Sequence, residues 1–379
     1  MSVLIFQSFV TFYVIKYFNW IEGAIIGNMI LYLAMACGYL AVSWSNHQKP
    51  LSVRTWFFAG LVLCIWATSM MQRKTIWLLL LWYALLWFGK GIYFCCLYLY
   101  EFAYVEKEDR VRYAGIQSSW KSVTEIIIPL VLWYFFSIVA LPQQVYLGIF
   151  ILAALMLVIT ALIVYDLPDI TLPPTHHTHY KTILKHTWAP NIIYLSLIGI
   201  NVMIPFIATL LEVYILQKES WMWLFQSITK IVTLGLLLLI LHFFHSTRGF
   251  RQLIFTSIAL GVMLLVAPRW SWWIVLIIYA LAKSFLFPLF STYEKSVGMH
   301  IMDTMVKPWE SMLPVIIIQV ILYAIIRALL FGVAYLFLYT WSSIYSLIIV
   351  LTTITGIGFI TIALSILVLY TSPRRHIPA

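Results

Sequence analysis

The sequence contains little charge. Only 9% of its 379 residues are Asp, Glu, Lys or Arg, whereas 63% are hydrophobic. An ordinary soluble domain is about a quarter charged and about half apolar. A soluble core cannot bury an apolar excess of this size, so the composition excludes a soluble globular protein. It predicts a chain that lies mainly in lipid, where each span needs roughly 20 apolar residues.

Cysteine is scarce as well. The four cysteines all lie in apolar runs, and none lies in a polar loop: Cys37, Cys64, Cys95 and Cys96. This distribution matches neither a disulfide framework nor a zinc pattern, so we interpret them as small buried hydrophobic residues.

Catalytic and cofactor motifs are absent too. The sequence has no Walker motif, zinc-protease motif, nucleophile elbow or paired-carboxylate glycosidase pattern. The histidines of the HHTH stretch (His176, His177 and His179) lack the spacing of metal ligands, so we expect a solvated loop there. We therefore predict no catalytic residues, no cofactor and no metal, and the protein is not expected to be an enzyme.

Apolar runs separated by polar residues predict an all-α polytopic membrane protein with twelve transmembrane helices. The first residues lack the basic segment and the cleavage site of a signal peptide, so we assign them to the first span. The expected bounds are 2–18, 21–44, 55–71, 75–100, 114–139, 145–165, 190–215, 221–243, 252–267, 272–292, 311–339 and 342–370.

Basic residues predict the orientation of these helices, because Lys and Arg in short loops stay on the cytoplasmic side. The C-terminus and the loops after helices 2, 4, 6, 8 and 10 carry thirteen Lys and Arg residues, whereas the opposite side carries five. We therefore expect both termini in the cytoplasm and a multi-pass protein of the plasma (inner) membrane. The net charge of +10 follows from this loop bias, so it does not indicate nucleic-acid binding.

The polar stretch 166–190 divides the predicted helices into an N-terminal bundle (1–165) and a C-terminal bundle (191–379), six helices in each. Three correspondences in matching order indicate that the bundles are related repeats. They are Tyr13 and Trp20 with Tyr214 and Trp221, Arg54 with Arg251, and Lys90 and Glu101 with Lys283 and Glu294. Since six is even, the two bundles would share one orientation, related by an axis along the membrane normal.

This topology resembles the Major Facilitator Superfamily. The segment LYLYEFAYVEKEDRVRYAG (Leu97 to Gly115) is similar to that superfamily's helix 4–5 loop, where a Glu that closes helix 4 is followed by an Arg and a Gly. The chain departs from the pattern in the loop Asn46 to Arg54, which has no Asp, and in helix 5, which lacks the Gly-Pro motif of exporters. Subfamily and transport direction therefore stay open. The resemblance implies secondary active transport by alternating access, with helices 1, 2, 4, 5, 7, 8, 10 and 11 around a central cavity.

Five basic residues lie inside the predicted spans: Lys90, Lys121, Lys230, Lys283 and Arg327. A charge at that depth costs roughly 2.5 kcal/mol or more on insertion scales and is usually functional. All five lie on helices that the resemblance places around the cavity. We predict that Lys90, Lys283, Arg327 and Lys230 bind a small anionic or zwitterionic solute, with Lys90 facing Lys283. The alternative is that Tyr hydroxyls and helix ends satisfy these charges for packing alone.

A second group of charged residues is a candidate for gating or coupling. Lys121 and Glu125 are four residues apart and can pair on one helix face. Two further pairs are expected at cytoplasmic helix ends, where they would form a gate or merely exposed surface pairs: Arg54 with Glu101, and Arg251 with Glu294. Glu125 and Glu212 are the candidates for coupling to protons.

Taken alone, the sequence predicts a monomeric secondary transporter whose partners are an anionic small solute, the lipid bilayer and, if coupled, protons. Two other interpretations stay open. One is an integral-membrane enzyme of lipid or glycan transfer, which would use the cytoplasmic histidines. The other is a transporter-derived sensor or assembly protein, favoured by the missing loop Asp.

Overall fold

The computed structural model describes residues 14–15, 20–70, 75–105, 110–138, 142–172, 203–243, 249–266, 271–281, 312–341 and 344–371. Within these residues the chain forms eleven α-helices and one two-stranded sheet. The elements are α2 (Ile21–Gln48), β1 (Leu51–Ser52), α3 (Val53–Met70), α4 (Ile76–Tyr104), α5 (Arg110–Ile138), α6 (Pro142–Tyr165), β2 (Thr171–Leu172), α8 (Met203–Leu216), α9 (Glu219–Phe243), α10 (Gly249–Val266), α11 (Trp272–Leu281), α13 (Met312–Trp341) and α14 (Ile344–Thr371).

The structure confirms an all-helical membrane protein. Eleven of the twelve predicted spans overlap a described helix, and the first lies outside the described residues except for 14–15. Residues 190–202 of the seventh span and 282–292 of the tenth also lie outside the described residues. Five of the described helices are long and apolar enough to cross a bilayer: Ile21–Asn46, Val53–Met70, Trp77–Glu101, Leu147–Tyr165 and Ile316–Thr340. On α6, aliphatic side chains such as Leu155, Ile159, Leu162 and Ile163 are exposed, as expected of a surface that faces lipid.

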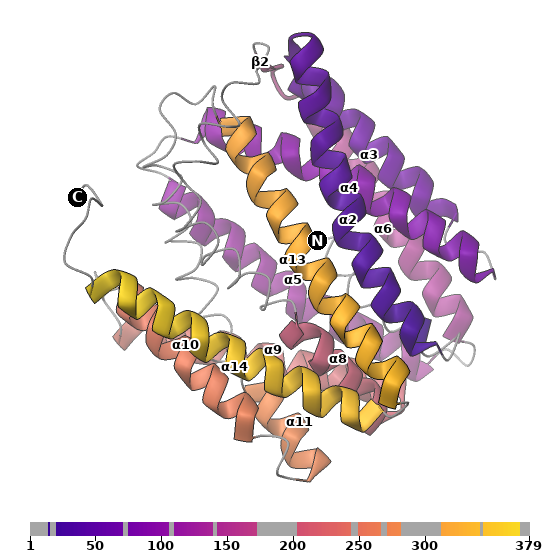
Figure 1. The fold of residues 1–379 in the computed structure, drawn as a ribbon. Helices are drawn as coiled ribbons and strands as arrows, with labels where there is room; N and C mark the ends of the chain where they lie inside the picture. The colour runs from indigo at the N-terminus through magenta and orange to yellow at the C-terminus, as the bar shows by residue number, and fades with distance from the viewer. Residues whose placement is uncertain are drawn as a thin grey trace.

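The helices contact one another in two groups (Figure 1). In the first group, α4 packs against α2 and α3, and α3 packs against α6. In the second, α8 contacts α9, α11 and α14, and α14 lies along α10. Helix α5 also contacts α6 of the first group, and α13 also contacts α14 of the second. The groups are joined where α13 packs along α2 and where α5 packs along α9. The α2–α13 contact therefore brings together helices from opposite ends of the chain.

Glycines allow the closest of these contacts, because small residues let helix backbones approach each other in lipid. A Cβ atom added to Gly91 of α4 would lie 2.2 Å from the carbonyl oxygen of Met35 on α2. A Cβ on Gly89 would lie 2.9 Å from the carbonyl oxygen of Gly60 on α3. The two glycines that flank Lys90 therefore let α4 pack closely against both α2 and α3, and this packing fixes the position of Lys90.

The short sheet ties the segment after α6 to the start of α3. Leu51 pairs with Leu172 and Ser52 with Thr171, in antiparallel orientation. The first three N–H groups of α3 are all bonded: Val53 N–H to the Ile170 carbonyl (3.0 Å), Arg54 N–H to Asp169 Oδ1 (3.1 Å) and Thr55 N–H to Ser52 Oγ (3.3 Å). Because a helix leaves these donors without internal partners, the segment Asp169–Ile170 acts as the N-terminal cap of α3.

Candidate functional site

Arg327 lies near the middle of α13 and is surrounded by aromatic rings. Its guanidinium carbon is 4.7 Å from the ring centroid of Tyr32 on α2 and 5.6 Å from that of Tyr323, one turn earlier on α13. Its Nε is buried and has no hydrogen-bond partner among the described residues. The guanidinium therefore lies against two aromatic rings, a favourable cation–π contact.

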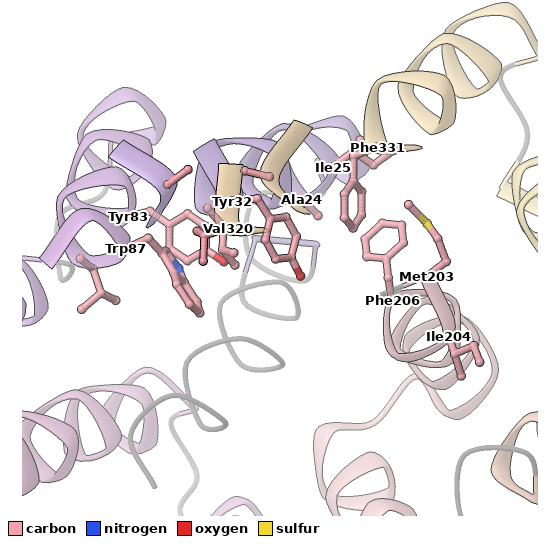
Figure 2. Packing of buried hydrophobic residues seen from close by; sticks show 14 of the residues in the cluster. Ala24, Ile25, Tyr32, Tyr83, Trp87, Met203, Ile204, Phe206, Val320 and Phe331 are labelled. Atoms are coloured by element: carbon pink, nitrogen blue, oxygen red, sulfur yellow. The ribbon is translucent and has the colours of Figure 1, made fainter. Parts of the chain in front are cut away.

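Aromatic side chains continue from this cation into the second group of helices (Figure 2). Tyr32 stacks on Phe331 of α13 with ring centroids 6.1 Å apart, and Phe331 meets Phe206 of α8 edge-on at 5.0 Å. Tyr32 is 3% exposed and Phe331 is fully buried. The three rings connect α2, α13 and α8, so they give the α2–α13 contact a rigid core.

Lys90 is another cation in the middle of a span, and it is only 1% exposed. Its Nζ lies 4.0 Å from the ring centroid of Trp87, one turn earlier on the same helix. Trp87 in turn meets Tyr83 edge-on at 6.0 Å, and Tyr83 lies near Tyr32 (Figure 2). Aromatic rings therefore lie beside both cations: Trp87 beside Lys90 on α4, and Tyr32 of α2 beside Arg327 on α13.

Several buried nitrogen donors in this region lack a hydrogen-bond acceptor. Within the described part of the chain, Gln319 Nε2 and Arg327 Nε on α13 have no partner. Trp82 Nε1 is in the same condition, at the α3–α4 contact where Trp82 packs edge-on against Trp66. A buried donor without a partner costs about 1–3 kcal/mol. The donors on α13 therefore favour a ligand that brings acceptor oxygens.

Glu212 is a buried carboxyl group on α8, 2% exposed. Its Oε2 accepts a hydrogen bond of 2.5 Å from Nε2 of Gln226 on α9, which is also buried. Lys230, the remaining described candidate for solute binding, lies one turn further along α9 and is partly buried. Glu212 therefore links two helices of the second group.

At the opposite end of the first group, Arg54 contacts the segment after α6. Its Nη1 donates to the Leu167 carbonyl at 3.4 Å, while Asp169 binds its backbone N–H and accepts a second hydrogen bond from Ser52 Oγ at 2.7 Å. Glu101 accepts a hydrogen bond of 3.0 Å from the hydroxyl of Tyr113 on α5. These hydrogen bonds of Arg54 and Glu101 go to different elements, and the predicted pairing of the two residues stays a prediction.

Three residues found here were not predicted from the sequence. Asp169 was assigned only to a polar linker, although it is the carboxylate that reaches the loop from Asn46 to Arg54, where an Asp was expected and is absent. Tyr32 and Tyr323 were among many tyrosines, and their role became visible only from their contact with Arg327.

Several predicted residues cannot be placed. Lys283 and Glu294 lie outside the described residues, so their expected positions opposite Lys90 and beside Arg251 stay predictions. Lys121 and Glu125 belong to α5 and Arg251 to α10, but their side chains also lie outside the description.

Comparison with solved structures identifies the fold. The chain is similar to a POT family transporter in complex with a thioalcohol-conjugated peptide, with a TM-score of 0.66 and 14% identity over 97% of this chain and 93% of that one. It is also similar to a point mutant of the nucleoside transporter NupG, with a TM-score of 0.64 and 15% identity over 98% of this chain and 97% of that one. No protein-family model matches the sequence, and no curated protein matches it.

These likenesses show that the chain shares its overall fold with these transporter structures, in agreement with the topology that the resemblance of the sequence predicted. The chain is a multi-pass integral membrane protein. The structures that it resembles are those of a POT family transporter in complex with a peptide conjugate and of a nucleoside transporter.

Proposed function

We propose that the protein is a secondary active transporter that moves a small anionic or zwitterionic organic solute by alternating access. The observation that carries the proposal is the group of buried N–H donors beside the mid-span cation of α13. Arg327 lies near the middle of that helix, and the buried donors of Gln319 and Arg327 have no acceptor among the described residues. An anionic solute would supply oxygen atoms to these donors and a negative charge to Arg327.

The proposed architecture is two six-helix bundles, residues 1–165 and 191–379, joined by the loop 166–190. The helix contacts support it, because the described helices fall into two groups that meet at the α2–α13 and α5–α9 contacts. Rocking of one bundle against the other would open these two contacts in turn. We place the protein in the plasma (inner) membrane as a monomer, with both termini in the cytoplasm, because of the basic residues in its predicted cytoplasmic loops.

The proposed solute ligands are Arg327, Lys90, Lys230 and Lys283. Arg327 is the best-supported ligand of the four, since the two rings that contact its guanidinium come from the two groups of helices, Tyr32 from α2 and Tyr323 from α13. Lys90 is buried beneath Trp87 in this state, so it would reach the solute only after Trp87 moves.

Coupling to protons is proposed for Glu212, and the Lys121–Glu125 pair is a further candidate. A carboxyl group that is buried in the membrane and bonded to an amide can change its charge during a cycle while its hydrogen-bond partner stays in place. The charged residues at the predicted cytoplasmic ends, Arg54 with Glu101 and Arg251 with Glu294, are proposed to close that side.

Uptake into proteoliposomes tests this function. Purified protein would be offered labelled dicarboxylates, amino acids, dipeptides and nucleosides, with Arg327→Ala, Lys90→Ala and Lys283→Ala as variants. Loss of one charge-assisted hydrogen bond lowers affinity by about ten- to a hundredfold, so we expect a defect of that order in Arg327→Ala. Lys49→Ala is the matched control, because Lys49 is an exposed cation outside the spans. Unchanged uptake in all three variants would refute the proposed site, and absence of any accumulation would favour a sensor.

A further inference from the structure

The ring that covers the guanidinium of Arg327 belongs to a different helix. Tyr32 is on α2, whereas Tyr323 is on α13 together with Arg327. Lys90 is different, because its aromatic partner Trp87 is on its own helix and moves with it. The position of Arg327 therefore depends on how α2 and α13 lie against each other.

Stacking leaves the hydrogen bonds of a guanidinium unused. The group is planar, and its five N–H donors point outward in that plane, whereas an aromatic ring contacts its flat face. The buried Nε of Arg327, which has no partner among the described residues, is consistent with such a seat. A guanidinium held by its face presents its edge to a ligand with two oxygens at matching spacing, as in a carboxylate or a phosphate.

Tyr32 is itself held firmly. It is 3% exposed and stacks on Phe331, which packs against Phe206. Figure 2 shows these rings following one another from α2 to α8. Because the ring cannot turn away without disturbing Phe331, it restricts a side chain that otherwise has several rotatable bonds. Affinity rises when a binding group is already ordered before its ligand arrives.

We infer that Tyr32 and Tyr323 are positioning residues that orient Arg327 as a planar fork for an oxyanion group of the solute, a carboxylate or a phosphate. The inference rests on the proposed function and deepens it, because it names the chemical group that the site selects. The tyrosines act through their ring faces and Arg327 makes the contact with the solute. Tyr32 can orient Arg327 only while α2 and α13 are in contact.

The test compares Tyr32→Phe with Tyr32→Leu. Phenylalanine keeps the ring face, so Tyr32→Phe should bind and transport as the wild type does. Leucine removes the face, so Tyr32→Leu should raise the solute concentration for half-maximal uptake by about tenfold while changing the maximal rate much less. Arg327→Lys should show the same shift, since lysine keeps the charge and loses the planar fork. Tyr93→Leu is the matched control, because Tyr93 stacks on Phe57 at the α3–α4 contact, away from Arg327.

Each variant is assayed with three solutes of one carbon skeleton: a carboxylate, a phosphate monoester and a neutral amide. The inference requires that Tyr32→Leu weakens transport of one or both anions and leaves any transport of the amide unchanged, and the affected anion identifies the group. It is overturned if Tyr32→Phe and Tyr32→Leu are equally impaired, or if the amide is affected as strongly as the anions.

A second measurement separates this inference from the proposed function. Anion-induced thermal stabilisation of the purified protein needs no transport, and it should be present in the wild type and Tyr32→Phe and reduced in Tyr32→Leu. If no solute accumulates but anions stabilise the wild type and Tyr32→Phe more than Tyr32→Leu, transport is refuted and the role of Tyr32 in orienting Arg327 is retained. If stabilisation by anions is the same in all three proteins, the fork is refuted.

Discussion

Replacing Arg327 by leucine should make the protein more stable and at the same time inactive. Arg327 lies near the centre of a 30-residue helix whose mid-section crosses the bilayer. If the cation serves packing, its removal should lower the stability of the protein. If it serves solute binding, its removal should raise the stability of the empty protein. Arg327→Leu therefore distinguishes a functional charge from a structural one.

The magnitude follows from two opposing terms. On insertion scales an Arg at a helix centre costs about 2.5–3.5 kcal/mol and a Leu contributes about −0.3 to −0.6 kcal/mol, a difference of roughly 3–4 kcal/mol. Arg327 is partly buried between protein helices, so we take about half of this value. The lost contacts with Tyr32 and Tyr323 subtract about 0.5–1 kcal/mol. The net gain is then about 1 kcal/mol, which for a chain of this size raises Tm by about 2 °C.

The assay pairs thermal unfolding of the detergent-purified protein with uptake into proteoliposomes. Arg327→Leu should unfold at a higher temperature than the wild type and show no uptake above empty liposomes. Val320→Leu, a substitution one to two turns away on the same helix, controls for general effects of an added leucine. A lower Tm in Arg327→Leu would refute the reasoning, because it would mean that the cation holds α2 and α13 together.

Three further predictions concern the packing, the cap of α3 and coupling. Gly91→Ala should destabilise the protein by about 1–3 kcal/mol, because the added Cβ would lie 2.2 Å from the Met35 carbonyl oxygen. Gly148→Ala is the control, since a Cβ there would have no atom within 4 Å, and it should be neutral or slightly stabilising in the same thermal assay. Asp169→Ala should lower the stability of the protein by about 1 kcal/mol, because α3 loses its N-terminal cap. Asp166→Ala, which removes an exposed carboxylate from the same segment, should leave the stability unchanged. Equal Tm values for the two variants would contradict a capping role of Asp169. Glu212→Gln should keep its bond to Gln226 and remain folded, but uptake should no longer respond to a pH gradient; a retained response would exclude Glu212 as the coupling group.

The spans could be predicted from the sequence because lipid demands long apolar runs and little else. The ends were less accurate, since a helix continues beyond the apolar run when its last turns are polar. Helix α2 extends to Gln48, four residues past its predicted end, and α5 begins at Arg110, four residues before its predicted start. In both cases charged or polar side chains continue the helix outside the hydrocarbon region, where hydropathy carries no signal.

The cap on α3 could not be predicted for a different reason. Asp169 and Ser52 are 117 residues apart, and each belongs to a segment too short to show strand periodicity. The mid-span cations were easy to find, because charge is rare in this chain, but their partners were not. Tyr32 is one of 23 tyrosines, and a helix surrounded by lipid and protein has no amphipathic pattern to indicate which face meets another helix.

The mid-span cations Lys90 and Arg327 therefore have different parts in a rocking mechanism. Lys90 stands between Gly89 and Gly91, which hold α4 against α3 and α2 at distances that leave no room for a side chain. Those three helices must move as one unit, so the surroundings of Lys90 change little when the groups of helices separate. Arg327 is covered by Tyr32 only while α2 and α13 remain in contact. If alternating access opens that contact, Arg327 loses the ring on one side and its affinity for an oxyanion falls, which would favour release of the solute.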